Sequence, residues 1–151
     1  MKNTIVFVMG VSGVGKSTVG SLLSKKLNMP FFDGDDYHPE KNISKMSEGI
    51  PLNDEDRLGW LESLNALAKN ELEKQGCVIA CSALKSKYRV LLEKEIKAAV
   101  KWVYLHGSFE EVFQRMNNRA NHFMSPQLLQ SQFDTLEEPK NAIKIDINLS
   151  P

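Results

Sequence analysis

The sequence of 151 residues is poor in cysteine, and the placement of its 2 cysteines excludes the usual roles. Cys77 and Cys81 flank one apolar run, and on a strand they would lie about 13 Å apart, too far for a disulfide. No second Cys or His pair has the spacing of a zinc site. The sequence therefore favours two buried thiols in a reducing compartment.

A charge of one sign and long hydrophobic runs are also missing. The chain has 19 basic and 19 acidic residues, so it has no overall field to attract nucleic acid or an anionic membrane. Its apolar runs are far shorter than the roughly 20 residues of a membrane span. The N-terminus enters an apolar run without the features of a cleavable signal. We therefore expect a cytoplasmic protein that binds neither nucleic acid nor membranes.

One segment that is present fits a phosphate-binding motif. Residues 10–17 read Gly-x-x-x-x-Gly-Lys-Ser between an apolar run and a helical pattern. In that setting, backbone N–H groups surround a phosphate at a helix N-terminus, while Lys16 reaches the β- and γ-phosphates and Ser17 offers a hydroxyl to Mg²⁺. We expect a nucleotide site made of Gly10, Val11, Ser12, Gly13, Val14, Gly15, Lys16, Ser17 and Thr18.

Short apolar runs alternate with helical patterns along the chain. The pattern predicts strands at 5–9, 30–33, 77–81, 101–105 and 142–147. It predicts helices at 17–27, 38–46, 85–99, 110–118 and 126–133. Asn53 or Asp54 should be the N-cap of a long helix that ends at Gly76 and carries Leu58, Leu61, Leu64, Leu67 and Leu72 on one face. This order indicates an α/β fold whose parallel sheet carries helices on both faces.

An acidic segment follows the second predicted strand. Asp33, Asp35 and Asp36 lie close enough to repel one another unless a cation is bound. Asp33 is our candidate to share Mg²⁺ with Ser17, because the third strand ends without the acidic residue that many P-loop enzymes use. Asp35 can accept the proton of an attacking hydroxyl. Asp36 as the base, or a solvated turn that caps the next helix, are the alternatives.

Basic and hydroxyl residues follow in three further places. Arg57 can hold a carboxylate or hydroxyls with two hydrogen bonds, or it forms a surface pair with Asp54. Ser82 and Lys85 follow the third strand, where they can bind substrate oxygens or simply begin a helix.

Two arginines, Arg115 and Arg119, lie four positions apart on one predicted helical face. An anion between them would relieve their repulsion, so they can clamp ATP phosphates in the transition state. The segment after them fits a lid that keeps water from the γ-phosphate. A solvated helix end with favourable dipole charge is the alternative.

Together these segments resemble the gluconate kinase family of small P-loop kinases, which is related in fold to shikimate kinases. The most specific blocks are Asp-Gly-Asp-Asp-Tyr-His-Pro at 33–39 and Pro-Leu-Asn-Asp-Glu-Asp-Arg at 51–57. Further matching segments lie at 42–46, 81–89 and 122–139, so the resemblance covers nearly the whole chain.

The resemblance implies one P-loop kinase domain over residues 1–151, with a three-layer architecture, a five-stranded parallel sheet and a lid at about 119–135. It implies that a homodimer transfers the γ-phosphate of ATP, with Mg²⁺, to the 6-hydroxyl of D-gluconate. Lys16, Asp35 and Arg119 would be the catalytic residues. The substrate would meet Asp35, Asp36, His38, Lys45, Arg57, Ser82, Lys85 and Arg89.

Two other functions are compatible with the same residues: a kinase of shikimate or another polyol acid, and a catalytically silent nucleotide-binding module. One departure from the family bears on the second. Such kinases continue past the fifth strand into a C-terminal helix, which this sequence lacks. We expect part of one sheet face to be exposed or covered by a partner subunit.

Overall fold

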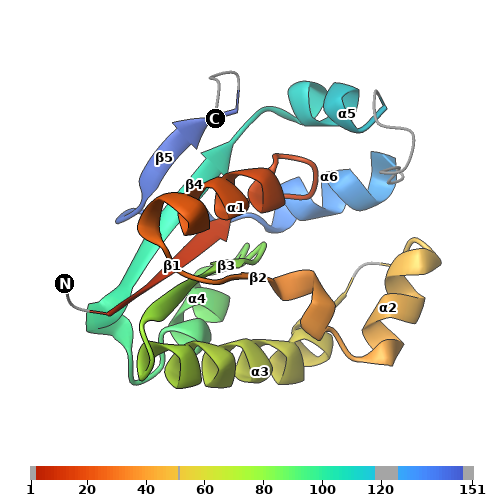
Figure 1. Ribbon diagram of the computed structural model, residues 1–151. Helices are drawn as coiled ribbons and strands as arrows, with labels where there is room; N and C mark the ends of the chain where they lie inside the picture. The colour runs from red at the N-terminus through yellow and green to blue at the C-terminus, as the bar shows by residue number, and fades with distance from the viewer. Residues whose placement is uncertain (1–2, 51, 118–125, 148–151) are drawn as a thin grey trace.

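The computed structural model describes residues 3–50, 52–117 and 126–147. Its centre is a five-stranded sheet with the strand order β2-β3-β1-β4-β5 (Figure 1). All four neighbouring strand pairs are parallel, which confirms the predicted fold class. The strands are β1 (Thr4–Met9), β2 (Phe31–Asp33), β3 (Gly76–Ala80), β4 (Val100–His106) and β5 (Ile143–Asp146).

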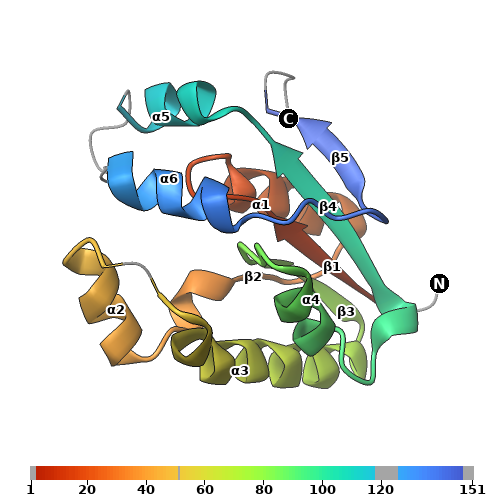
Figure 2. The same cartoon turned by 180° about the vertical axis from the view of Figure 1, so that it is seen from behind.

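Helices cover both faces of this sheet, as Figure 2 shows for α5 and α6 on one side and α3 and α4 on the other. Alternate side chains of β1 explain the two layers: Ile5 and Phe7 face α3 and α4, whereas Val6 and Val8 face α1, α5 and α6. The helices are α1 (Lys16–Leu27), α2 (Glu40–Ser47), α3 (Asp54–Leu72), α4 (Ser86–Leu92), α5 (Phe109–Asn117) and α6 (Pro126–Thr135), with 3₁₀ turns η1 (Gly34–Tyr37) and η2 (Lys97–Ala99).

The start of α3 is fixed by a capping box. The Asn53 side chain accepts a hydrogen bond from the Asp56 N–H, and the Asp56 carboxylate accepts one from the Asn53 N–H. The predicted helix start is therefore confirmed at Asn53. Of the leucines predicted on one face, Leu61 and Leu64 are buried, whereas Leu58 near the start of α3 is 45% exposed and lines an apolar pocket.

The predicted helix at 85–99 is also wrong in its second half. The helix α4 ends at Leu92, and Glu95 takes a left-handed conformation with φ of 69°. The Asn65 side chain donates hydrogen bonds to the carbonyls of Leu92 and Lys94 at this end. The turn lets Ile96 reach the core before the chain enters β4, a tertiary gain that helical periodicity cannot reveal.

Three loops gather at the carboxyl ends of the central strands. The N–H of Gly10 donates to the Ser82 carbonyl at 3.3 Å, which joins the loop after β1 to the loop after β3. A Cβ on Gly34 would lie 2.5 Å from the Ala80 carbonyl oxygen, so the acidic turn after β2 packs closely against β3. Ligands of open α/β sheets bind at this edge.

Cys77 on β3 and Cys81 directly after that strand are free and buried, as predicted. Burial raises the pKa of both thiols to about 12, so they are protonated at neutral pH and are poor nucleophiles and metal ligands. In the described ranges, none of the helices has the length and apolarity needed to cross a membrane.

Candidate active site

The loop after β1 has the backbone of a phosphate-binding loop. Gly13 and Gly15 have φ of 86° and 97°, a region that L side chains rarely adopt. A Cβ on Gly13 would lie 2.8 Å from a Met116 side-chain carbon, so α5 packs against the loop. Gly15 leads directly into α1, and among the described residues no side chain caps that end. The N–H groups of the first turn therefore remain available to an anion.

Lys16 folds over this loop. Its ammonium donates hydrogen bonds of 3.0 Å to the carbonyls of both Gly10 and Val11. Burial lowers the pKa of Lys16, while the acidic groups Asp35, Cys81 and Asp33 act in the opposite direction. The ammonium is thus held between the loop and the acidic turn, where the terminal phosphates of a nucleotide would lie.

Ser17 and Asp33 lie together, as expected for a shared metal. The Ser17 hydroxyl donates a 3.1 Å hydrogen bond to Asp33 Oδ2, and Asp33 Oδ1 accepts one from the Asp35 N–H at 3.0 Å. Within the described residues no cluster of three or more His, Cys, Asp or Glu could hold a metal ion. One hydroxyl and one carboxylate nevertheless fit Mg²⁺, which keeps several waters and takes the rest of its ligands from phosphates.

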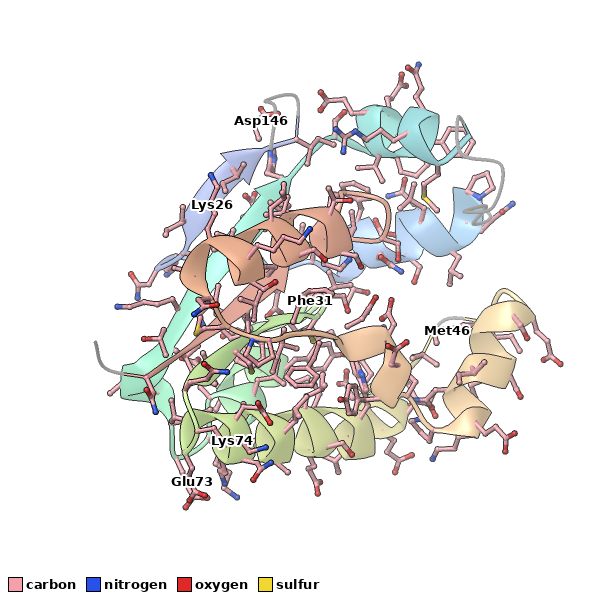
Figure 3. The ribbon with its side chains drawn as sticks, in the orientation of Figure 1. Lys26, Phe31, Met46, Glu73, Lys74 and Asp146 are labelled. Carbon is pink, nitrogen blue, oxygen red and sulfur yellow. The ribbon has the colours of Figure 1, made fainter. Side chains whose placement is uncertain are left out.

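Beside Lys16 is a cavity of about 220 Å³. It combines residues from loops and helices far apart in the sequence. Met46, labelled in Figure 3, marks the part of its wall that comes from α2. The predicted residues that line it are Ser12, Lys16, Asp35, His38, Arg57 and Ser82. The other lining residues are Met46, Leu52, Trp60, Leu84, Leu128, Ser131 and Gln132.

The cavity distinguishes the two candidate bases. Asp35 lines it, whereas Asp36 is exposed and is not among the residues that line it. The Asp35 side chain is 72% exposed, but the protein around the cavity desolvates the carboxyl group enough to raise its pKa. Lys16 opposes that rise, and repulsion from Asp33 and Asp36 adds to it. The geometry favours Asp35 over Asp36 as the base.

Arg57 extends from α3 to the rim of the cavity. Its guanidinium donates hydrogen bonds of 2.8 Å to the Leu52 carbonyl and 2.9 Å to the Tyr88 hydroxyl, and it lies over the Tyr88 ring. The predicted surface pair with Asp54 does not form, because Asp54 instead binds Lys85, Lys87 and the Tyr88 hydroxyl. These bonds hold the pKa of Asp54 well below its usual range.

Three residues expected at the substrate lie elsewhere. Lys45 forms a 2.8 Å ion pair with Asp56 of the capping box, and Lys85 pairs with Asp54. Arg89 is buried, and its guanidinium donates hydrogen bonds to the carbonyls of Ala83 and Glu137. These hydrogen bonds connect the loop after β3 to the segment after α6, so the role of Arg89 is structural.

The expected pair of phosphate-binding arginines is described only in part. Arg115 donates hydrogen bonds to the Val14 carbonyl at 3.3 Å and to the Ile147 carbonyl at 2.9 Å. It therefore links the phosphate-binding loop to the end of β5. Arg119 and the first half of the expected lid, at 119–125, lie outside the described residues.

Sequence reasoning placed α6 within the lid but did not single out Gln132 as a residue of the site. Gln132 accepts a 2.7 Å hydrogen bond from the Ser12 N–H and donates one of 3.1 Å to the Ser12 hydroxyl. The carboxamide thus joins α6 to the phosphate-binding loop. The only signal in the sequence is a pair of polar residues, Ser131 and Gln132, within an otherwise amphipathic helix.

Comparison with known proteins agrees with this geometry. The model of the shikimate kinase family matches residues 12–143. The thermosensitive gluconokinase of Escherichia coli K12 is 48% identical, and the match covers 93% of this chain and 78% of that protein. A probable gluconokinase of Rattus norvegicus is 46% identical, over 95% of this chain and 89% of its own length.

The chain belongs to the gluconokinase family, within the shikimate kinase-like P-loop kinases. The predictions of the family and of a small-molecule kinase are confirmed. A solved gluconokinase from Sinorhizobium meliloti 1021 superposes on this gluconokinase-family chain with a TM-score of 0.88 at 41% identity, covering 99% of this chain and 85% of the other. A shikimate kinase from Aquifex aeolicus, with a TM-score of 0.62 and 18% identity, shares the fold.

Proposed function

We propose that this protein phosphorylates D-gluconate with ATP and produces 6-phospho-D-gluconate. The observation that carries the proposal is the shared cavity of Lys16, Asp35 and Arg57 beside an intact phosphate-binding loop. A cation for the phosphates, a carboxylate for the attacking hydroxyl and a guanidinium for the sugar acid are the groups that this reaction needs. The gluconokinases among the relatives support gluconate as the acceptor.

In the proposed reaction, Asp35 accepts the proton of the 6-hydroxyl while the hydroxyl oxygen bonds to the γ-phosphorus. The bond from that phosphorus to the β–γ bridging oxygen breaks, and ADP leaves. Lys16 stabilises the negative charge that develops on the phosphates. Ser17 and Asp33 would hold Mg²⁺, which neutralises charge on the β- and γ-phosphate oxygens when it is bound.

The proposal includes several parts that lie around this centre. A single kinase domain over 1–151 would close a lid at about 119–135, and Arg119 would join Lys16 at the phosphates. Closure would keep water from the γ-phosphate. Arg57 and Ser82 would contact the sugar acid. Asp36, Lys45, Lys85 and Arg89 would lie farther out and would not contact it directly. We propose a cytoplasmic homodimer as the working form.

The test is an acceptor panel. ADP release is measured with D-gluconate, shikimate, glycerate and a nucleoside monophosphate, with and without Mg²⁺, and light scattering gives the mass. We expect Mg²⁺-dependent release with gluconate and the mass of a dimer. Release with shikimate alone would make the protein another polyol-acid kinase. Calorimetric ATP binding without transfer to any acceptor would make it a silent nucleotide-binding module.

A further inference from the structure

His38 has a setting that suits neither a surface residue nor a metal ligand. It follows η1, its side chain is buried, and its ring stacks on Trp60 with centroids 4.0 Å apart. His38 contributes to the wall of the cavity that Asp35 also lines. Burial, with a smaller effect of the Arg57 charge, lowers the pKa of His38 to about 4. The ring is therefore neutral at pH 7, with its proton on one of two nitrogens.

Asn42 of α2 decides which nitrogen carries that proton. The Asn42 side chain is fully buried, and its nitrogen Nδ2 lies 2.8 Å from the carbonyl oxygen of Asp56. A carbonyl oxygen can only accept, so the amide must turn its NH₂ group, and not its oxygen, toward Asp56. The orientation of the Asn42 amide is therefore set by the backbone of α3.

The same Nδ2 atom lies 3.2 Å from Nδ1 of His38. Because an amide nitrogen only donates, Nδ1 must be the unprotonated, accepting nitrogen. The proton of the neutral ring is then on Nε2, on the side of Asp35. Asp56, Asn42 and His38 thus form a chain in which a backbone carbonyl fixes the tautomer of a cavity residue.

The distance from His38 Nε2 to Asp35 Oδ1 is 4.0 Å, too long for a direct hydrogen bond. A single hydroxyl oxygen can lie about 2.8 Å from both atoms, since two such bonds span up to about 5.6 Å. Such an oxygen would accept a hydrogen bond from the Nε2–H of His38 and donate one to the carboxylate of Asp35. The opposite tautomer would present a second acceptor, which a hydroxyl with one proton could not satisfy together with Asp35.

We propose that His38 is a specificity-determining residue whose Nε2–H binds, jointly with Asp35, one hydroxyl of the acceptor, and that Asn42 is the positioning residue that keeps the proton on Nε2. The assignment of gluconate as the acceptor rests on the function proposed above, but the tautomer does not. It is a property of the protein without any substrate.

A cost in stability accompanies this arrangement. Asn42 Oδ1 is buried, and the described residues offer it no hydrogen-bond partner. A buried polar atom in that state destabilises the folded protein. Leucine would fill similar space without the cost, but it would leave Nδ1 of His38 without a donor. The amide of Asn42 therefore lowers stability but supplies the donor for Nδ1 of His38.

The first test reads the tautomer in the full-length protein. Proton–nitrogen-15 correlation spectra through two and three bonds distinguish a ring protonated on Nε2, a ring protonated on Nδ1 and an imidazolium. The His38 signals are assigned by their loss in His38→Gln. We expect the Nε2–H form at pH 7 and a shift of the Nε2 signal when gluconate is added. An Nδ1–H form or an imidazolium would overturn the inference whether or not gluconate is a substrate.

The second test changes the positioning residue. Asn42→Asp replaces the donor by an acceptor, so the ring should move its proton to Nδ1 or become charged. We expect the KM for gluconate to rise at least 10-fold, the KM for ATP to change less than 2-fold, and the spectrum to report the changed ring. The matched control is Asn65→Asp, which buries the same carboxylate against the end of α4.

The outcomes separate the possible failures. A KM for gluconate that rises equally in both variants, or an Asn42→Asp ring still protonated on Nε2, would overturn the positioning role. No turnover of gluconate by the unchanged protein would instead refute the proposed function and leave the tautomer result standing. If Asn42→Asp does not fold, the wild-type spectrum still decides the inference.

Discussion

The nucleotide side and the acceptor side of the site are built in different ways. The loop at 10–17, which we propose holds the nucleotide phosphates, is contiguous in sequence and presents mostly backbone N–H groups shaped by Gly13 and Gly15. The acceptor side collects side chains from η1, α3, the loop after β3 and α6. A site made of backbone is specified by local conformation, whereas a site made of converging side chains is specified by the packing of the whole fold.

This difference separates two kinds of chemistry. Every nucleoside triphosphate presents similar phosphates, so a backbone loop with one lysine suffices to hold them. An acceptor is recognised by the positions of its hydroxyl and carboxylate groups, which requires directed side chains. We expect changes on the nucleotide side to affect the rate with any acceptor, and changes on the acceptor side to affect which acceptor is used.

The largest expected effect is on the acceptor side. Asp35→Asn removes the proton acceptor but preserves the size of the side chain, so phosphoryl transfer should fall below detection while ATP still binds by calorimetry. The folded protein should be no less stable, because the raised pKa of Asp35 means that folding disfavours its charged form. Loss of ATP binding would instead assign Asp35 to the metal.

The pH profile gives a second reading of the same residue. Since the ionised carboxylate is the active form and its pKa is raised in the free protein, kcat/KM for gluconate should fall on acidification at a pH above about 3.9, the ordinary pKa of an aspartate. Asp36→Asn removes one source of repulsion and should move this acidic limb to lower pH without abolishing turnover. An inactive Asp36→Asn enzyme would make Asp36 the base.

Lys16→Ala tests the nucleotide side, and we expect kcat to fall roughly 10²-fold or more, the scale of losing one electrostatic stabiliser. The loss should be the same for every acceptor that is turned over. Lys25→Ala, an exposed lysine near the end of the same helix, is the control and should leave kcat unchanged. Near-normal turnover of Lys16→Ala would remove this lysine from the mechanism.

The two sides also differ in how far the sequence predicts them. The loop at 10–17 is recognisable because local spacing dictates its conformation, and Ser17 and Asp33 do lie together. The sheet follows from alternating patterns, with β1 to β5 all close to their expected positions. These features depend on interactions between near neighbours or on a periodicity that burial imposes.

The remaining features depend on contacts that periodicity does not encode. Arg57 and Arg89 are both arginines on helices near one cleft, yet one lines the cavity and the other holds backbone carbonyls. Gln132 meets Ser12 from 120 positions away in the sequence. The helical pattern predicted at 85–99 is interrupted at Glu95, where a left-handed turn brings Ile96 into the core. Only the packed fold distinguishes these cases.

The two arginines permit a direct test of that distinction. Arg57→Lys loses the paired donors at the rim, and we expect the KM for gluconate to rise about 10-fold with a small change in melting temperature. Arg89→Lys should do the reverse, because its buried hydrogen bonds are structural: roughly 2 kcal/mol lost lowers the melting temperature by about 4–8 °C. If the KM of Arg89→Lys rose for gluconate and not for ATP, Arg89 would instead contribute to the substrate site.

The smallest expected effect is at the contact between the two sides. Gln132→Ala removes two neutral hydrogen bonds to Ser12, each worth about 1 kcal/mol. We expect about half of that total to be lost from the transition state, so kcat should fall roughly 5-fold. Gln132→Glu should also raise the KM for ATP, because its carboxylate would repel the phosphates. Gln130→Glu, which places the same charge on the exposed side of α6, controls for net charge. Equal effects at both positions would mean that α6 influences ATP only through long-range charge, and not through Ser12.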